Sequence, residues 1–256
     1  MKISALIVTY NEEKRLEQCL NSIIRFDELA VVDLGSQDHS VEIARNMGIK
    51  VIPHPWVPFG ELVLPSLMPT MKNDWIIRVD PDEVLPSELM EDLIKLDLTE
   101  EYGMICVPYQ FYFLNSKLDT TIWGGVRHIP RLLNRKKSVV EPDVHRTYRC
   151  KPGFETYYLP IKSDNAVQHY WVDSYSQLFS KHGRYIALEG KSRYNNGMKF
   201  RWKTCLISTI RGFLRSFIKY SGWRGGWSGW FLSWFYGLYE FRAWLSLRRY
   251  EKGLSK

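Results

Sequence analysis

The chain has 256 residues, of which 45% are hydrophobic and 25% are charged. These values are typical of a globular protein and exclude a chain that is disordered throughout. The net charge of +7 is unevenly distributed along the sequence. Residues 1–183 carry 20 Lys and Arg against 25 Asp and Glu, whereas residues 184–256 carry 15 against 3, a net charge of +12.

The beginning of the chain leads directly into an apolar run, without the pattern of a secretory signal peptide. The four cysteines, Cys19, Cys106, Cys150 and Cys205, are scattered without metal-binding spacing. Both observations favour reduced thiols and a cytoplasmic protein.

The first hundred residues alternate short apolar runs with amphipathic segments. Ile3–Thr9, Leu29–Asp33 and Trp75–Val79 predict strands that are buried on both faces of a sheet. Helical patterns follow the first two, and this alternation predicts βαβ units in a parallel sheet. A further helix is expected over Phe59–Met71, bent or interrupted at Pro65.

The pattern changes beyond residue 95. Gly103–Leu114 and Val126–Asn134 predict longer strands, Tyr157–Ile161 predicts one more, and helices dominate from about Asp173. We therefore expect an α/β domain over residues 1–172 and a basic, Trp-rich helical region over residues 173–256.

Polar side chains follow three of the predicted strands at the point where each strand ends. These segments are Thr9-Tyr10-Asn11-Glu12, Asp33-Leu34-Gly35-Ser36 and Asp80-Pro81-Asp82-Glu83. The carboxyl ends of parallel strands line the ligand crevice of an open α/β sheet. The first two segments offer acceptors and a tight polar turn, which suit a nucleotide. No Gly-rich dinucleotide fingerprint follows the first strand, which argues against NAD or FAD.

The third segment places two carboxylates one residue apart, at Asp80 and Asp82. Mg²⁺ is commonly held by one or two carboxylates together with substrate phosphates. On spacing alone, a solvated turn before a helix is an equal alternative. The other two strand ends favour the metal site.

These three segments, in this order and spacing, resemble glycosyltransferase family 2, and the similarity is clear over about residues 1–95. The resemblance is to small bacterial enzymes that build lipopolysaccharide core or surface glycans. It implies a GT-A (Rossmann-like) α/β fold, with a mostly parallel central sheet flanked by helices and a helical C-terminal extension. The domain would then divide into a nucleotide-sugar half, about residues 1–98, and an acceptor half, about residues 99–172.

The resemblance also implies roles for individual residues. The nucleotide-sugar site would comprise Thr9, Tyr10, Asn11, Glu12, Asp33, Ser36, Asp80 and Arg131. Thr9, Tyr10 and Glu12 would line the base pocket, and Asp33 would contact the base. Asp82, with Asp80 against the metal or the ribose, would hold a divalent cation, Mg²⁺ or Mn²⁺. Arg131 either binds phosphates or faces solvent.

Related enzymes often carry Val-His-Glu where this chain has Val144-His145-Arg146. His145 either completes the metal site, contacts the leaving diphosphate or is structural. His169 and Trp171 either contact the acceptor or pack. An inverting transfer also needs a general base within reach of the acceptor hydroxyl. The candidates for this base are Asp143, Glu141 and Glu83.

The C-terminal region contains an uncharged aromatic run. Gly225–Tyr239 has no charged residue, but it is shorter than the ~20 apolar residues of a membrane-spanning helix. Trp and Tyr beside Arg and Lys predict an interfacial helix on an anionic membrane surface. The alternative is an aromatic helix packed on the protein. Nucleic acid is not expected as a partner, because no nucleic-acid-binding motif is present.

The sequence therefore predicts a metal-dependent, inverting glycosyltransferase. Its donor would be a UDP-sugar, and its acceptor a hydroxyl of a lipid-linked or lipopolysaccharide glycan at the cytoplasmic face of the cell membrane. A nucleotidyltransferase would carry a Gly- and Lys-rich loop where this chain has an acidic strand end. A non-catalytic membrane- or glycan-binding protein on a degenerate transferase fold is the other alternative. The donor sugar, the linkage and the oligomeric state are left open.

Overall fold

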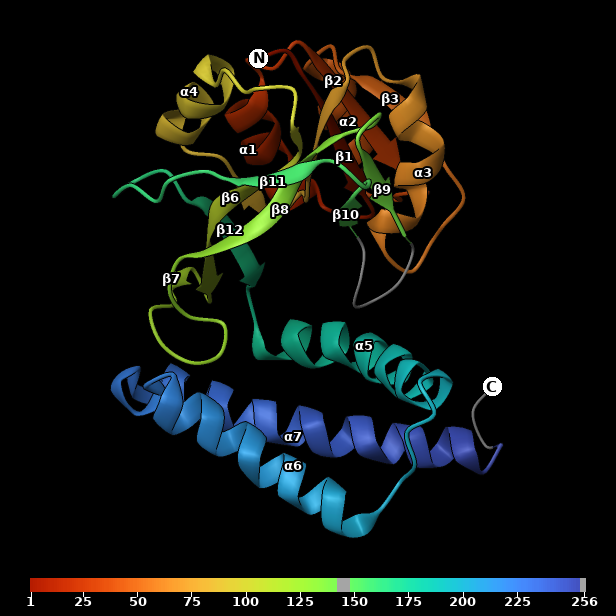
Figure 1. Cartoon of the computed structure of the whole chain (residues 1–256), viewed down its shortest axis with the longest axis vertical. Coiled ribbons are helices and arrows are strands. Elements are labelled where there is room, and N and C mark those ends of the chain that lie inside the picture. The colour runs from red at the N-terminus through yellow and green to blue at the C-terminus, as the bar shows by residue number, and fades with distance from the viewer. Residues whose placement is uncertain (142–147, 254–256) are drawn as a thin grey trace. The chain divides into compact units, whose positions relative to one another are not determined.

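A computed structural model describes residues 1–141 and 148–253 (Figure 1). The chain forms two compact units. The first comprises residues 1–110 and 126–169, and the second comprises residues 111–125 and 170–256. The second unit thus combines the C-terminal helices with an internal segment from the strand-rich part of the chain.

Strands and helices alternate along the first hundred residues, and three long helices end the chain. The strands are β1 (Ile3–Thr9), β2 (Glu28–Asp33), β3 (Lys50–Pro53), β4 (Trp75–Val79), β5 (Glu83–Val84), β6 (Tyr102–Phe113), β7 (Ser116–Lys117), β8 (Arg127–Asn134), β9 (Ser138–Val140), β10 (Tyr148–Cys150), β11 (Glu155–Tyr158) and β12 (Val167–Val172). The α-helices are α1 (Glu13–Ile23), α2 (Ser40–Asn46), α3 (Leu64–Leu67), α4 (Ser87–Lys95), α5 (Tyr175–Asn195), α6 (Trp202–Leu214) and α7 (Gly226–Glu251). The shorter helical turns are η1 (Gly60–Val63), η2 (Met68–Thr70), η3 (Arg215–Lys219) and η4 (Gly222–Arg224).

The central sheet has the strand order β3-β2-β1-β4-β8-β6-β12-β5. β1 is parallel to β2 and β4, and β2 is parallel to β3. β8 is antiparallel to β4 and β6, and β12 is antiparallel to β5. Thr9 lies opposite Asp33, and Ile7 lies opposite Val79, so the three polar strand ends meet at one edge of the sheet. The expected α/β fold with a mostly parallel, helix-flanked sheet and a helical C-terminal region is confirmed.

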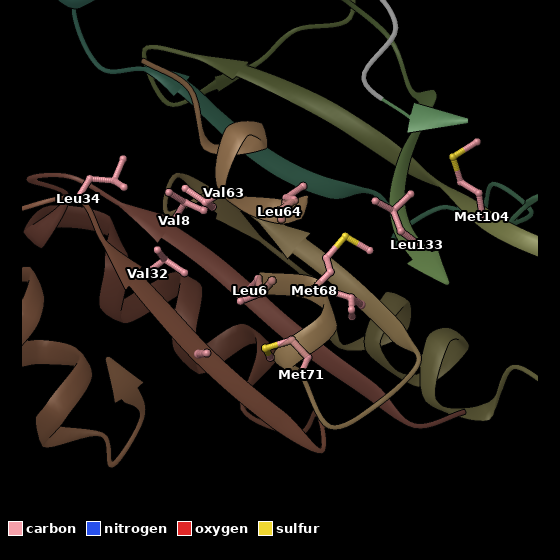
Figure 2. Packing of buried hydrophobic residues seen from close by; sticks show 12 residues of the cluster. Leu6, Val8, Val32, Leu34, Val63, Leu64, Met68, Met71, Met104 and Leu133 are labelled. Carbon is pink, nitrogen blue, oxygen red and sulfur yellow. The ribbon is translucent and has the colours of Figure 1, made fainter. Parts of the chain in front are cut away.

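Helices cover the parallel strands because apolar side chains on both faces need burial. Every residue of β1 is buried. Figure 2 shows Leu6 of β1 and Val32 of β2 in one cluster with Leu64 of α3 and Met68 of η2. These contacts fix the positions of the strands whose ends carry the polar segments.

The segment expected as one interrupted helix, Phe59–Met71, forms the three pieces η1, α3 and η2. Pro65 and Pro69 each lie in the first turn of a new piece. Proline is tolerated there because the first-turn N–H has no partner within the helix, whereas further along it would break the hydrogen-bond ladder.

In the second unit, α7 packs against both α5 and α6. Leu232, Phe235 and Leu247 of α7 are buried, while small residues lie where α6 meets α7. Over residues 1–141 and 148–253, no helix has both the length and the apolar content needed to cross a membrane.

Candidate active site

Reciprocal hydrogen bonds join the loops that follow β1 and β2. The N–H of Asn11 donates to Ser36 Oγ at 2.9 Å, and the N–H of Gln37 donates to Asn11 Oδ1 at 2.7 Å. Asn11 has a left-handed backbone, with φ of 56°, which asparagine tolerates better than most residues. The Asp33 carboxylate accepts from the N–H groups of Gly35 at 3.2 Å and Ser36 at 3.0 Å. The result is one ordered polar rim at the end of two strands.

The residues at the end of β1 differ in their exposure to solvent. Thr9 is buried, whereas the ring of Tyr10 is 43% exposed. An exposed aromatic ring is a surface on which a nucleotide base can stack. The backbone N–H of Glu12 donates to Ser40 Oγ at 2.9 Å, which fixes the start of α1.

Asp80, which follows β4, is held between two arginines. Its Oδ2 accepts from Arg78 Nη2 at 2.8 Å and lies 3.5 Å from Arg131 Nη1. Burial favours a raised pKa for Asp80, but the positive charges of Arg78 and Arg131 outweigh it and hold the pKa well below its usual range. Asp80 is therefore an ionised carboxylate whose charge is already balanced by the protein.

Glu83 lies at the centre of a buried polar cluster and is 1% exposed. Its Oε1 contacts Tyr109 Oη and Arg131 Nη2 and lies 3.3 Å from His169 Nδ1. Its Oε2 accepts from the N–H of Asp80 at 3.1 Å. Burial raises the pKa of Tyr109 well above its usual value, so this residue is a neutral hydroxyl within the cluster. The Glu83 carboxylate faces these partners inside the protein.

His169 joins this cluster to Asp82. β12 pairs with β5, which places His169 opposite Glu83 in the sheet. The Nε2 atom of His169 lies 3.7 Å from Asp82 Oδ2, and the imidazole is largely buried. His169 is not among the metal ligands predicted from the sequence. The available signal was the alternation of the buried residues Val167, His169 and Trp171, which marks a strand with one face in the core.

Asp82 and His169 suit a divalent cation. A carboxylate oxygen and an imidazole nitrogen are both ordinary metal ligands, and Mg²⁺ often completes its shell with substrate phosphates and water. A metal-ligating histidine commonly donates its other ring nitrogen to a carboxylate, as His169 Nδ1 faces Glu83 here. Across residues 1–141 and 148–253, no group of three or more His, Cys, Asp or Glu side chains is arranged to hold a metal.

Of the remaining predicted residues, one pairs with a nearby arginine and two lie outside the described residues. Glu141 is paired with Arg149, whose Nε and Nη2 lie 2.8 Å and 2.6 Å from Glu141 Oε1. Asp143 and His145 lie outside the described residues. The structure thus brings Asp80, Glu83 and Arg131 together and adds His169 beside Asp82.

Comparison with known proteins decides the family of the chain. Residues 4–152 match the profile of Glycosyl transferase family 2. The chain belongs to glycosyl transferase family 2. An uncharacterized glycosyltransferase of Rickettsia bellii is 30% identical over 207 residues, covering 77% of this chain and 69% of that protein. A second, from Rickettsia typhi, is 29% identical over 225 residues, covering 84% and 76%.

Among solved structures, this glycosyltransferase is similar to glucosyl-3-phosphoglycerate synthase from Mycobacterium tuberculosis, crystallised with Mn²⁺, UDP and glucosyl-3-phosphoglycerate. The TM-score is 0.48 at 15% identity, and the match covers 77% of this chain and 81% of that chain. Family membership selects glycosyl transfer over the nucleotidyl transfer weighed from the sequence. The matched residues of the glycosyltransferase include all three strand-end segments and Arg131, whereas His169 lies beyond them.

Proposed function

We propose that this glycosyltransferase moves a sugar from a nucleoside diphosphate donor, a UDP-sugar, to an acceptor hydroxyl, with the help of a divalent cation and with inversion at the anomeric carbon. The observation that carries the proposal is the pairing of Asp82 with His169. This pair lies at the same sheet edge as the ends of β1 and β2, whose loops are joined by hydrogen bonds. This edge combines a place for a nucleotide with a place for a cation.

The donor would lie along the three strand ends. Tyr10 would offer its exposed ring to the base, and Thr9 and Glu12 would complete the base pocket. Asp33 accepts from the N–H of Ser36 and so supports the turn. Asn11 keeps the two loops in register through its bonds to Ser36 and Gln37. Asp80 and Arg131 would face the ribose and the diphosphate of such a donor.

The cation, Mg²⁺ or Mn²⁺, would be held by Asp82 and His169, with Asp80 nearby. When bound, a divalent cation neutralises charge on the diphosphate as it leaves. Glu83 holds the imidazole through Nδ1 and also contacts Arg131. Its enclosure supports a positioning role for Glu83, in place of the base role expected from the sequence.

The acceptor hydroxyl would attack the anomeric carbon on the face opposite the diphosphate, so that the configuration inverts. A carboxylate must take the hydroxyl proton as the new bond forms. We assign this step to Asp143, with Glu141 as the second candidate because its carboxylate is paired with Arg149. His145 remains a candidate for the metal or the diphosphate.

We further propose that the acceptor is a lipid-linked or lipopolysaccharide glycan, and that the enzyme acts as a peripheral protein at the cytoplasmic face of the cell membrane. Support comes from the basic, Trp-rich C-terminal region, which carries a net charge of +12 over residues 184–256.

The test is calorimetry with a panel of nucleotide sugars, with and without Mn²⁺, combined with transfer assays of Asp82→Asn. We expect donor binding that depends on the cation, and transfer that falls to background in the variant. The matched control is Asp97→Asn, at an exposed position on the same unit. Full transfer by Asp82→Asn would refute the mechanism. A wild-type protein that binds no nucleotide sugar would instead support a non-catalytic binding protein.

A further inference from the structure

The outward face of α6 and η3 is apolar, contrary to the usual pattern of a surface helix. Ile207, Ile210, Leu214 and Ile218 recur at helical spacing, and their exposed fractions are 52%, 59%, 43% and 61%. A helix on the surface of a soluble domain normally turns such a stripe toward the core and charged residues toward water. Contiguous exposed apolar surface of this kind marks an interaction site.

The inward face of the same helix carries small residues. Cys205, Gly212 and Ser216 are buried. Ser216 Oγ lies 3.0 Å from Ser233 Oγ of α7, and a Cβ added at Gly212 would lie 3.2 Å from Glu240. Small and hydroxyl residues also lie between the helices of membrane-spanning bundles, whose large apolar residues face lipid.

Basic side chains line the apolar stripe. Arg211, Arg215 and Lys219 each follow a stripe residue by one position, and they border a hollow of about 1000 Å³ with Ile210 and Ile218. The acidic residue in this hollow, Glu240, accepts a hydrogen bond from Arg193 at 3.0 Å. The surface is therefore apolar along its centre and positive along its edge.

The stripe continues onto α7. Ile210 also borders a second hollow, of about 340 Å³, together with Phe213 and Trp234. Trp234 is 42% exposed, and the neighbouring Trp230 stacks on Trp227 at 5.7 Å between ring centroids. Tryptophan favours the level of lipid headgroups, where its ring is apolar and its N–H is solvated.

We propose that this surface docks the enzyme on an anionic lipid leaflet. The α6 face, as we call it, consists of Ile207, Ile210, Leu214, Ile218 and Trp234 with Arg211, Arg215 and Lys219. The apolar side chains enter the headgroup boundary, and the basic row meets the lipid phosphates. The inference rests on the membrane-bound acceptor of the proposed function. It adds the surface by which the enzyme would meet the membrane.

The test is co-sedimentation of the full chain with vesicles of phosphatidylcholine, prepared with and without phosphatidylglycerol. Two variants divide the α6 face into its apolar and basic parts: Ile210→Ser/Ile218→Ser and Arg211→Gln/Lys219→Gln. The matched control is Ile24→Ser/Ile161→Ser, which removes isoleucines of similar exposure, 49% and 51%, from the first unit.

We expect the wild type and the control to bind the anionic vesicles, and the apolar variant to bind at least about tenfold more weakly. The basic variant should lose affinity by about tenfold, and its binding should depend less on salt than that of the wild type. All variants should retain the donor binding and the helix content, by circular dichroism, of the wild type measured without vesicles, which shows that both units are folded.

Three results would overturn the inference: no binding of the wild type to anionic vesicles, unchanged binding of the apolar variant, or a dimer in light scattering that this variant dissociates. The third would assign the α6 face to a second copy of the chain. Vesicle binding without any nucleotide-sugar binding would refute the proposed function, but the α6 face would still be assigned to lipid binding.

Discussion

The Oε1 atom of Glu83 lies 3.3 Å from Nδ1 of His169, on the strand paired with β5. This contact orients the imidazole so that Nε2 is on the side of Asp82. The same carboxylate also meets the buried guanidinium of Arg131. Glu83 therefore couples the proposed cation site to the charge balance of the protein interior.

Replacement of the Glu83 carboxylate should weaken both cation binding and the stability of the fold. In Glu83→Gln, we expect Mn²⁺ affinity to fall about 10- to 100-fold, because the imidazole loses the carboxylate that orients it. We also expect the free energy of unfolding to fall by about 3 kcal/mol, because Arg131 loses a buried ionic partner. Calorimetric Mn²⁺ titration and urea unfolding measure the two effects. The control is Glu17→Gln, at an exposed position of α1. Unchanged Mn²⁺ affinity would remove the positioning role.

The proposed base can be identified by two isosteric changes. Asp143→Asn should lower kcat by about 100-fold or more while donor binding stays unchanged, because only proton removal is lost. Glu141→Gln should have a smaller effect, since its carboxylate already pairs with Arg149. Single-turnover kinetics with a defined donor and acceptor separates the two steps. A large loss in Glu141→Gln, with an active Asp143→Asn, would move the base to Glu141.

We expect His182 to make the second unit sensitive to acid. Its ring lies among Trp171, Phe235 and Tyr239, with centroid distances of 5.2, 4.9 and 5.8 Å. Burial, aided by the charge of Lys181, lowers the pKa of His182 below its ordinary value of 6.5.

The unfolded chain therefore binds a proton at this residue more readily than the folded one. Stability should fall as the pH drops below about 6.5 toward the folded pKa. His182→Phe should lessen this loss, measured as the free energy of unfolding at a series of pH values. Parallel pH profiles for wild type and variant would contradict the assignment.

Gly229 allows α7 to approach η4. A Cβ at this position would lie 2.0 Å from the carbonyl oxygen of Gly222. Gly229→Ala should therefore lower the free energy of unfolding by about 2 kcal/mol or more. Gly183→Ala, in α5, meets nothing within 4 Å and should be neutral or stabilising by up to about 1 kcal/mol. Urea denaturation compares the two, and equal effects would argue against the close approach.

The sequence predicted the parallel half of the sheet well because β1, β2 and β4 are continuous apolar runs, and their polar ends mark one edge. It did not predict β12, because Val167–Val172 mixes aromatic with polar residues and has no continuous apolar run. Its pairing with β5 also joins Glu83 to His169, 86 residues apart in the chain. Such contacts depend on the whole fold, so the pairing of Asp82 with His169 could not be predicted from the sequence.

The aromatic run Gly225–Tyr239 shows a similar limit. Its lack of charge indicated a helix against either a membrane or protein, and α7 carries both buried and exposed apolar side chains. Leu232 and Phe235 are buried, while Trp230 and Trp234 are exposed. The apolar face of α6, in contrast, could not be assigned to the outside, because periodicity gives the stripe but not the direction in which it faces.

Reciprocal hydrogen bonds join the loop after β1, at Asn11, to the loop after β2. The two loops are distant in the sequence but form one cooperative element. We expect the two loops to open together, since displacement of Asn11 breaks its bond to Ser36 and also releases the amide of Gln37. The backbone amides of Asn11 and Gln37 should therefore exchange with solvent in the same opening event. A nucleotide arriving at this rim would meet a surface that is ordered before it binds, and little of its binding energy would be spent on arranging these loops.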